Sequence, residues 1–125
     1  MSIENVRKWF MIHTYSGYEK KVKTDLEQKM ETLGFKEVVT NILVPEEELT
    51  EIVRGKPKKV YRKLFPAYVM LEMEATREEN EQGISYKVDP RVWYEVRNTN
   101  GVTGFVGVGS DPIPMEEEEV KNIFN

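Results

Sequence analysis

Residues 97–100 carry the kinds of side chain that hydrogen-bond the bases or phosphates of a nucleic acid. They follow a short predicted helix, because Asp89 is a favourable N-cap and Pro90 suits the first helical position. Gly101 can adopt the positive φ that ends such a helix, and a strand is predicted from Val102. The sequence therefore predicts a row of polar side chains held out at a fixed turn: Arg97, Asn98, Thr99 and Asn100.

The charged residues form separate basic and acidic groups. A formal net charge of -4 argues against a protein that coats nucleic acid non-specifically, since that affinity comes mostly from phosphate neutralisation. Each basic group is a candidate contact for phosphates, and the alternative is an ordinary solvated surface of a helix or hairpin. The basic groups are Lys20, Lys21 and Lys23, and then Arg54, Lys56, Lys58, Lys59, Arg62 and Lys63; the acid-rich segments are 46–51, 77–81 and 116–119.

The sequence does not predict an enzyme. His13 is the only histidine, and Ser16 is better explained as a helix cap than as a nucleophile, so no catalytic triad is predicted. Cysteine is absent, which excludes disulfides and thiolate metal sites. Consecutive glutamates on a helix point in different directions, and the glycines between 101 and 109 follow a helix rather than lead into one. We therefore expect no catalytic residue, no metal site and no cofactor.

Hydrophobic periodicity predicts an α+β domain. Alternation in 8–14 predicts a strand with Phe10 and Ile12 on one face, and Ser16 and Glu19 have the spacing of a capping box for the helix that follows. We expect an α/β/α sandwich, in which helices flank one mostly antiparallel sheet of about four strands. The remaining expected features are strands at 38–45, 61–64, 67–73 and 102–106, a hairpin tip at 51–59, a helix end at Gly34 and a final helix after Met115.

Length and composition indicate the number of domains and the expected location of the protein. The chain has 125 residues, of which 39% are hydrophobic and 32% charged, so we expect a single domain over 1–125 with a hydrophobic core. Residues 74–89 have the charge and glycine content of an inserted loop or a ragged helix. The longest apolar runs are of strand length and no apolar stretch follows basic residues at the N-terminus. No membrane span and no secretory signal are therefore predicted, and the cytoplasm is the expected location.

The run Arg-Asn-Thr-Asn-Gly-Val-Thr-Gly-Phe-Val-Gly at 97–107 resembles the N-terminal domain of the NusG family of transcription elongation factors, in which proline is usual where Asn100 stands. The resemblance continues at 9–22, at 44–48 and at 65–69, where glycine is usual in place of Ala67. These blocks follow the family's order. Two features depart from the pattern: 73–93 is longer than in most bacterial relatives, and the chain stops at Asn125 without the C-terminal KOW domain.

The resemblance implies an apolar pocket that receives the clamp helices of the β′ subunit of RNA polymerase, with the β subunit as a further candidate contact. The residues that it implies for this pocket are Trp9, Phe10, Phe65, Pro66 and Tyr68. Ordinary core packing is the alternative interpretation of these aromatic side chains. Contacts with Rho or a ribosomal protein are implied only if a KOW domain follows.

The resemblance also implies a second surface, which faces the non-template DNA strand of the transcription bubble. Its residues are Lys20, Lys21, Lys23, Arg97, Asn98, Thr99 and Asn100. Together the two surfaces imply a non-enzymatic transcription elongation factor domain that modulates pausing, termination or antitermination. The alternative is a free-standing nucleic-acid or ribonucleoprotein binding module that uses its basic hairpin and has no polymerase partner.

Overall fold

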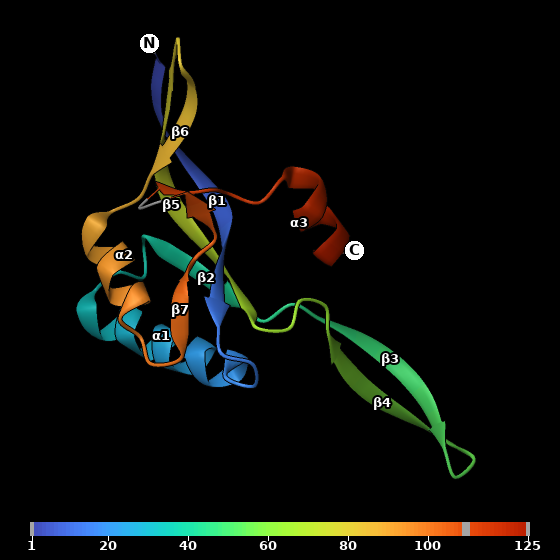
Figure 1. The fold of residues 1–125 in the computed structure, drawn as a ribbon. Helices are drawn as coiled ribbons and strands as arrows, with labels where there is room; N and C mark the ends of the chain where they lie inside the picture. The colour runs from blue at the N-terminus through green and yellow to red at the C-terminus, as the bar shows by residue number, and fades with distance from the viewer. Residues whose placement is uncertain (1, 109–110, 125) are drawn as a thin grey trace.

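The computed structural model describes residues 2–108 and 111–124, and an antiparallel sheet forms its centre (Figure 1). Strands β1 (Ser2–Thr14) and β5 (Tyr68–Asn80) pair along nearly their whole length. On the far side of β5 lie β2 (Val39–Leu43) and, further along, β6 (Gly83–Lys87), while β7 (Val102–Phe105) pairs with β1. The most apolar predicted strand does lie inside the sheet, because β5 has neighbours on both sides.

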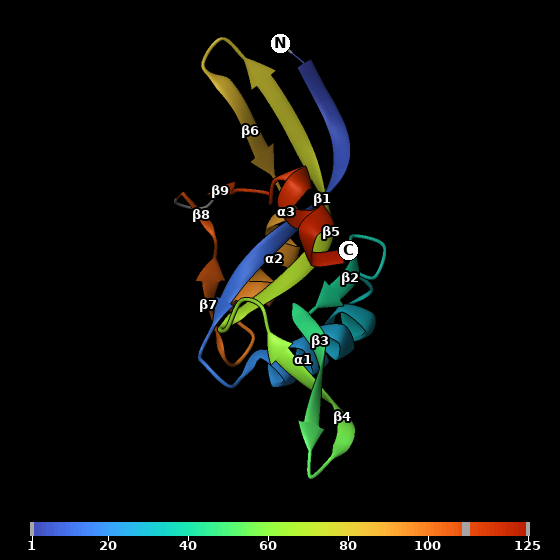
Figure 2. The ribbon, with the colours of Figure 1, turned by 90° about the vertical axis from the view of Figure 1, so that its right-hand side faces the viewer.

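Helices lie on both sides of this sheet. Helices α1 (Glu19–Leu33) and α2 (Pro90–Arg97) cover one face, and α3 (Glu117–Phe124) lies on the other side (Figures 1 and 2). The sheet and the first two helices enclose the core, whose fully buried side chains are Phe10, Ile12, Val22, Leu26, Met30, Val69, Leu71, Met73, Val92 and Val96. The predicted α+β fold with a mostly antiparallel sheet flanked by helices is confirmed.

The predicted helix ends are correct in two places and wrong in a third. The Asp89 carboxylate accepts a hydrogen bond of 2.9 Å from the Arg91 N–H and begins α2, and Gly34, at φ 78°, ends α1. The capping box of Ser16 and Glu19 does not form, because α1 begins at Glu19 and has no side-chain cap. The Glu19 carboxylate instead accepts a hydrogen bond from the Ala67 N–H, just before β5.

Residues 74–89 are mostly strand, so the expectation of an inserted loop or a ragged helix is wrong. Strand β5 continues to Asn80 because the N-terminal half of β1 supplies backbone partners as far as Ser2, opposite Glu79. The chain then turns at Gly83, at φ 123°, and β6 returns along β5. These three strands extend beyond the helices at the top of Figure 1, where charged side chains have access to solvent on both faces.

Two strand pairs lie apart from the central sheet. Strands β3 (Glu46–Val53) and β4 (Lys56–Lys63) form a hairpin that projects away from the body, as the lower right of Figure 1 shows. We call this hairpin the arm. It confirms the hairpin expected around 51–59. The second pair, β8 (Gly107–Val108) and β9 (Asp111–Pro112), is short and follows β7.

The Glu19 side chain, which is only 1% exposed, joins α1 to the base of the arm and to the start of β5. Its Oε2 atom accepts a hydrogen bond of 2.9 Å from the Ala67 N–H, and its Oε1 atom lies 3.2 Å from the Lys63 ammonium. Burial raises the pKa of Glu19, but the N–H groups of Ala67 and of Glu19 itself, together with Lys63, outweigh burial and leave the pKa below its ordinary value.

We predict that the domain loses stability in acid because Glu19 then loses its stabilising charge. A carboxyl group whose pKa is lowered by folding contributes stability above its unfolded pKa, near 4.5, and that contribution is lost as the pH falls through the folded pKa. Glu19→Gln should lower the free energy of unfolding at pH 7 by about 1 to 3 kcal/mol, because it leaves buried partners poorly satisfied. It should also flatten the pH dependence between about 5 and 2.

Urea unfolding at a series of pH values measures both effects. Glu31→Gln is the matched control, because Glu31 lies on the same helix with an exposed side chain that is 3.8 Å from Lys36. A Glu31→Gln protein should follow the parent, while an unchanged pH profile in Glu19→Gln would contradict the proposed contribution of the buried carboxylate.

Candidate functional site

An aromatic surface lies on the face of the sheet opposite α1 and α2. Successive residues of a strand point to opposite faces, so Trp9 and His13 point away from the core that contains Phe10 and Ile12. Tyr68 is directly opposite His13 in the sheet, and the two rings are 4.2 Å apart. The pairing therefore places three aromatic side chains on this outer face of β1 and β5.

The turn before β5 adds two more residues to the aromatic surface. Phe65 is 38% exposed, Pro66 is also exposed, and the Phe65 carbonyl accepts a hydrogen bond of 3.2 Å from the Tyr68 N–H. Ala67 closes this turn at φ 69°, with its N–H on the Glu19 carboxylate. The buried carboxylate therefore fixes the turn that presents Phe65. The aromatic surface consists of Trp9, His13, Phe65, Pro66 and Tyr68.

Two residues that were expected to line the same pocket, Trp9 and Phe10, lie on opposite faces of the sheet. Phe10 is fully buried between the sheet and the helices, so the expectation that its side chain lines a binding pocket is wrong. Trp9, on the opposite face, is half-buried, and its ring centroid is 5.3 Å from that of Phe124 in α3. An ion pair of 3.7 Å between Lys8 and Glu117 also joins β1 to this helix.

The turn at 97–100 is only partly exposed. Asn98 is exposed, and its side-chain amide donates to the Tyr94 carbonyl at 2.8 Å, which closes the end of α2. Thr99 is buried, and its hydroxyl donates to the Glu95 carbonyl at 2.9 Å. The expectation of an exposed row is therefore wrong for Thr99, whose hydroxyl satisfies the last turn of the helix. Asn100 is exposed.

Two further residues hold this turn in place. The Lys29 ammonium donates to the Glu95 carbonyl at 2.9 Å and to the Thr99 hydroxyl at 3.2 Å, so α1 supports the end of α2. The guanidinium of Arg97 lies over the Trp93 ring at 5.0 Å. The role of Lys29 has no signal in the sequence, because no local pattern connects two residues so far apart in the chain. The turn is thus a rigid support for the Asn98 and Asn100 side chains.

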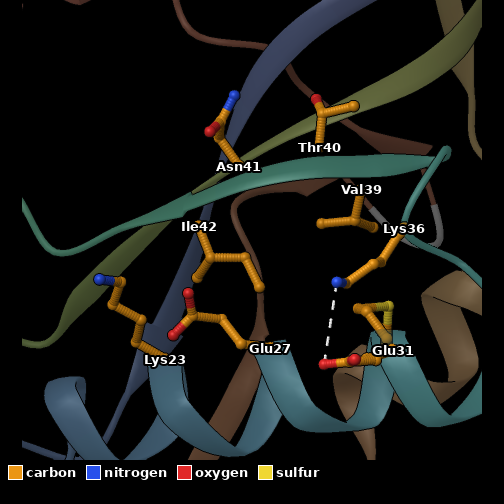
Figure 3. A pocket seen from close by; sticks show the side chains of 9 residues that line it. Lys23, Glu27, Glu31, Lys36, Val39, Thr40, Asn41 and Ile42 are labelled. Carbon is orange, nitrogen blue, oxygen red and sulfur yellow. Dashed lines mark ion pairs between the residues drawn. The ribbon is translucent and has the colours of Figure 1, made fainter.

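The three lysines expected to form one basic patch point in different directions. Lys21 forms an ion pair of 2.7 Å with Asp25, on the side of α1 that faces the polar turn. Lys20 lies 3.6 Å from Glu46 at the base of the arm. Lys23 instead lines a cavity of about 570 Å³ between α1 and β2, next to Glu27 (Figure 3). The helical repeat disperses these charges, and acids offset part of them.

The basic residues of the arm face acidic partners. In the register of β3 and β4, Glu46 is opposite Lys63, Glu47 opposite Arg62, and Glu51 opposite Lys58. Arg62 and Glu47 form an ion pair, as do Lys59 and Glu48 at 3.2 Å. The basic segment is therefore one side of a ladder of opposite charges, which favours the interpretation as a solvated hairpin over a free phosphate-binding patch.

The chain is a domain of the α+β class that presents a partly exposed aromatic surface and a supported polar turn. Among residues 2–108 and 111–124, no cluster of three or more side chains could hold a metal ion, and no helix is long and apolar enough to cross a membrane. Comparison with known proteins gives the family. The model of the family described as transcription termination factor nusG matches residues 7–124, and the chain belongs to this family of non-enzymatic transcription factors.

Named relatives and a solved structure agree with this assignment. The chain is 46% identical to the transcription termination/antitermination protein NusG of Halalkalibacterium halodurans and 43% identical to that of Bacillus subtilis, in each case over 94% of this chain and 61% of the relative. It resembles the structure titled "Domain interaction in Thermotoga maritima NusG" with a TM-score of 0.68 and 31% identity, over 95% of this chain and 56% of that chain. The chain thus spans about 60% of the length of these relatives.

We predict that Phe10 and Trp9 differ sharply in their contribution to folding. Phe10→Ala should lower the free energy of unfolding by about 3 to 5 kcal/mol, because it leaves a cavity in the core. Trp9→Ala should cost less than half of this, since the Trp9 ring is half-buried and packs mainly on α3. Urea unfolding of the two variants measures the difference, and equal losses would contradict the assignment of the two side chains to opposite faces.

Proposed function

We propose that this chain is the polymerase-binding domain of a transcription elongation factor, and that the aromatic surface binds the clamp helices of the β′ subunit. The observation that carries the proposal is that the exposed Phe65 and the half-buried Tyr68 lie on a turn that a buried carboxylate holds in place. Membership of the NusG family, whose named relatives are termination/antitermination proteins, supports it. By binding there, the domain modulates pausing, termination or antitermination.

The aromatic surface has the properties of a helix-binding site. Aromatic side chains dominate the energy of many interfaces when they lie in a well-packed centre. Phe65 and Tyr68 follow one another around a tight turn, so a helix tip can contact both without reordering the backbone. Trp9 and Phe124 border the same face of the sheet and would widen the apolar contact.

We further propose that the polar turn contacts the non-template DNA strand. Asn98 and Asn100 are exposed, and the guanidinium of Arg97, the preceding residue, lies over the Trp93 ring. Amide side chains can hydrogen-bond base edges, which gives discrimination of about 1 to 3 kcal/mol per good contact. The turn therefore contributes sequence preference, while the aromatic surface supplies most of the affinity. The buried Thr99 supports the turn through the hydrogen bond from its hydroxyl to the Glu95 carbonyl.

The charge ladder of the arm counts against the alternative function. A free-standing nucleic-acid module would rely on the basic residues of β4, but acids lie opposite several of them and neutralise part of the field. Co-purification with RNA polymerase distinguishes the two functions, since the alternative has no polymerase partner.

For the clamp contact, we predict that changing both Phe65 and Tyr68 to alanine weakens binding to bacterial RNA polymerase by at least about 2 kcal/mol. Changing Ile52 and Tyr61 to alanine is the matched control, because both lie on the arm and are more exposed than Phe65. Polymerase affinity is measured by fluorescence titration, and circular dichroism checks that each variant is folded. A folded Phe65 and Tyr68 variant with parental affinity would refute the clamp contact.

For the polar turn, we predict that Asn98→Ala together with Asn100→Ala spares polymerase binding but changes where the enzyme pauses. The affected sites should share bases at fixed positions in the non-template strand. Pause half-lives on templates randomised in that strand measure the effect. Identical pause patterns with intact binding would leave the turn as a structural cap of α2.

A further inference from the structure

Two exposed tyrosines lie at the start of α1, outside both surfaces described so far. Tyr15 is 61% exposed and Tyr18 is 43% exposed, and their ring centroids are 6.1 Å apart in an edge-to-face arrangement. The backbone between them is a closed turn, in which the Tyr18 N–H donates to the Tyr15 carbonyl at 3.0 Å and Gly17 adopts φ 89°. The rings are therefore presented by a defined backbone but remain open to solvent.

This tyrosine turn is attached to the polar turn. The Tyr15 N–H donates to the Gly101 carbonyl at 2.9 Å. Gly101 is buried under Tyr18, since a Cβ atom there would lie 3.2 Å from the Cδ1 atom of the Tyr18 ring. The loop after β1 and the loop before β7 accordingly lie at the same end of the molecule in Figure 1. The tyrosine rings thus lie beside the backbone at Gly101, the residue that directly follows the polar turn.

The surroundings of the tyrosines indicate what binds them. Their neighbours along the chain are Ser16, Gly17 and the exposed Lys20 and Lys21, so the rings lie in a polar setting, although Glu46 and Asp25 pair with the two lysines. An apolar protein helix would find few aliphatic contacts there. An unpaired nucleobase fits better, because it has a flat π-face for a tyrosine ring, polar edges for amides and a phosphate for lysines.

We infer that Tyr15 and Tyr18 form a stacking platform for unpaired bases of single-stranded DNA. This inference rests on the proposed function, because it places on the tyrosines a base of the strand whose edges face the polar turn. Stacking requires no particular base, so the platform supplies affinity for any exposed base, while the amides of the polar turn supply preference.

A titration of the 125-residue chain with two oligonucleotides tests the platform. One probe is a thymidine decamer, and the other is a decamer of abasic sites with the same phosphates and no bases. The variants are Tyr15→Leu and Tyr15→Phe, with Tyr94→Leu as matched control because Tyr94 is 59% exposed on α2. Amide chemical shifts at low salt give the affinity and the location of binding.

Tyr15→Leu should weaken binding of the thymidine decamer by roughly 5- to 100-fold, the range expected when one stacked base loses its partner. Tyr15→Phe and Tyr94→Leu should bind as the parent does, and the abasic decamer should bind equally weakly to all four proteins. The inference is overturned if the parent does not bind the thymidine decamer, if Tyr15→Leu binds it unchanged, or if the loss is equal on the abasic probe.

Polymerase affinity separates this inference from the proposed clamp contact. Tyr15→Leu should keep parental affinity for RNA polymerase without DNA, and the Phe65 and Tyr68 variant should keep its affinity for the thymidine decamer. If Tyr15→Leu loses polymerase affinity and keeps DNA binding, the tyrosines belong to a protein interface and the platform is refuted. If the Phe65 and Tyr68 variant keeps polymerase affinity while Tyr15→Leu loses DNA binding, the clamp contact fails and the platform stands.

Discussion

The carboxylate of Glu19 connects three parts of the molecule that are distant in the sequence: the first turn of α1, the end of the arm at Lys63 and the turn before β5 at Ala67. A buried charge is tolerated only when its partners satisfy it, so these three parts must come together when the domain folds. Residues close to Glu19 and Ala67 belong to the proposed contact surfaces, namely the tyrosine turn and the aromatic surface. Tyr18 precedes Glu19, and Phe65 lies two residues before Ala67.

The conformation of Ala67 reflects this constraint. A non-glycine residue at φ 69° costs about 1 to 2 kcal/mol relative to ordinary backbone, yet the turn adopts it and directs the Ala67 N–H to Glu19. Glycine would take the same conformation without that cost. The chain therefore accepts local backbone strain in order to satisfy a buried charge and to present the aromatic surface.

The sequence predicted the features that depend on local contacts. The Asp89 carboxylate reaches an N–H only two residues away, and the alternation of β1 placed Phe10 and Ile12 correctly on one face. Features that depend on distant partners were missed. Lys29 and Thr99 are 70 residues apart, and the strand character of 74–89 comes from pairing with β1. The resemblance implied that Phe10 lines the pocket. Successive residues of a strand point to opposite faces, however, and Phe10 points into the core.

Within the part of the chain that the structure describes, β3 and β4 pair only with each other, so the two strands of the arm depend largely on one another. An isolated hairpin of two strands is marginally stable, and here opposite charges across the strands supply part of its order. Such pairs weaken as salt screens them over distances of about 8 Å at physiological ionic strength. The stability of the arm therefore depends more on ionic strength than that of the body, which has a hydrophobic core. Concentrated salt should open the arm first and speed its amide hydrogen exchange, while the core keeps its protection.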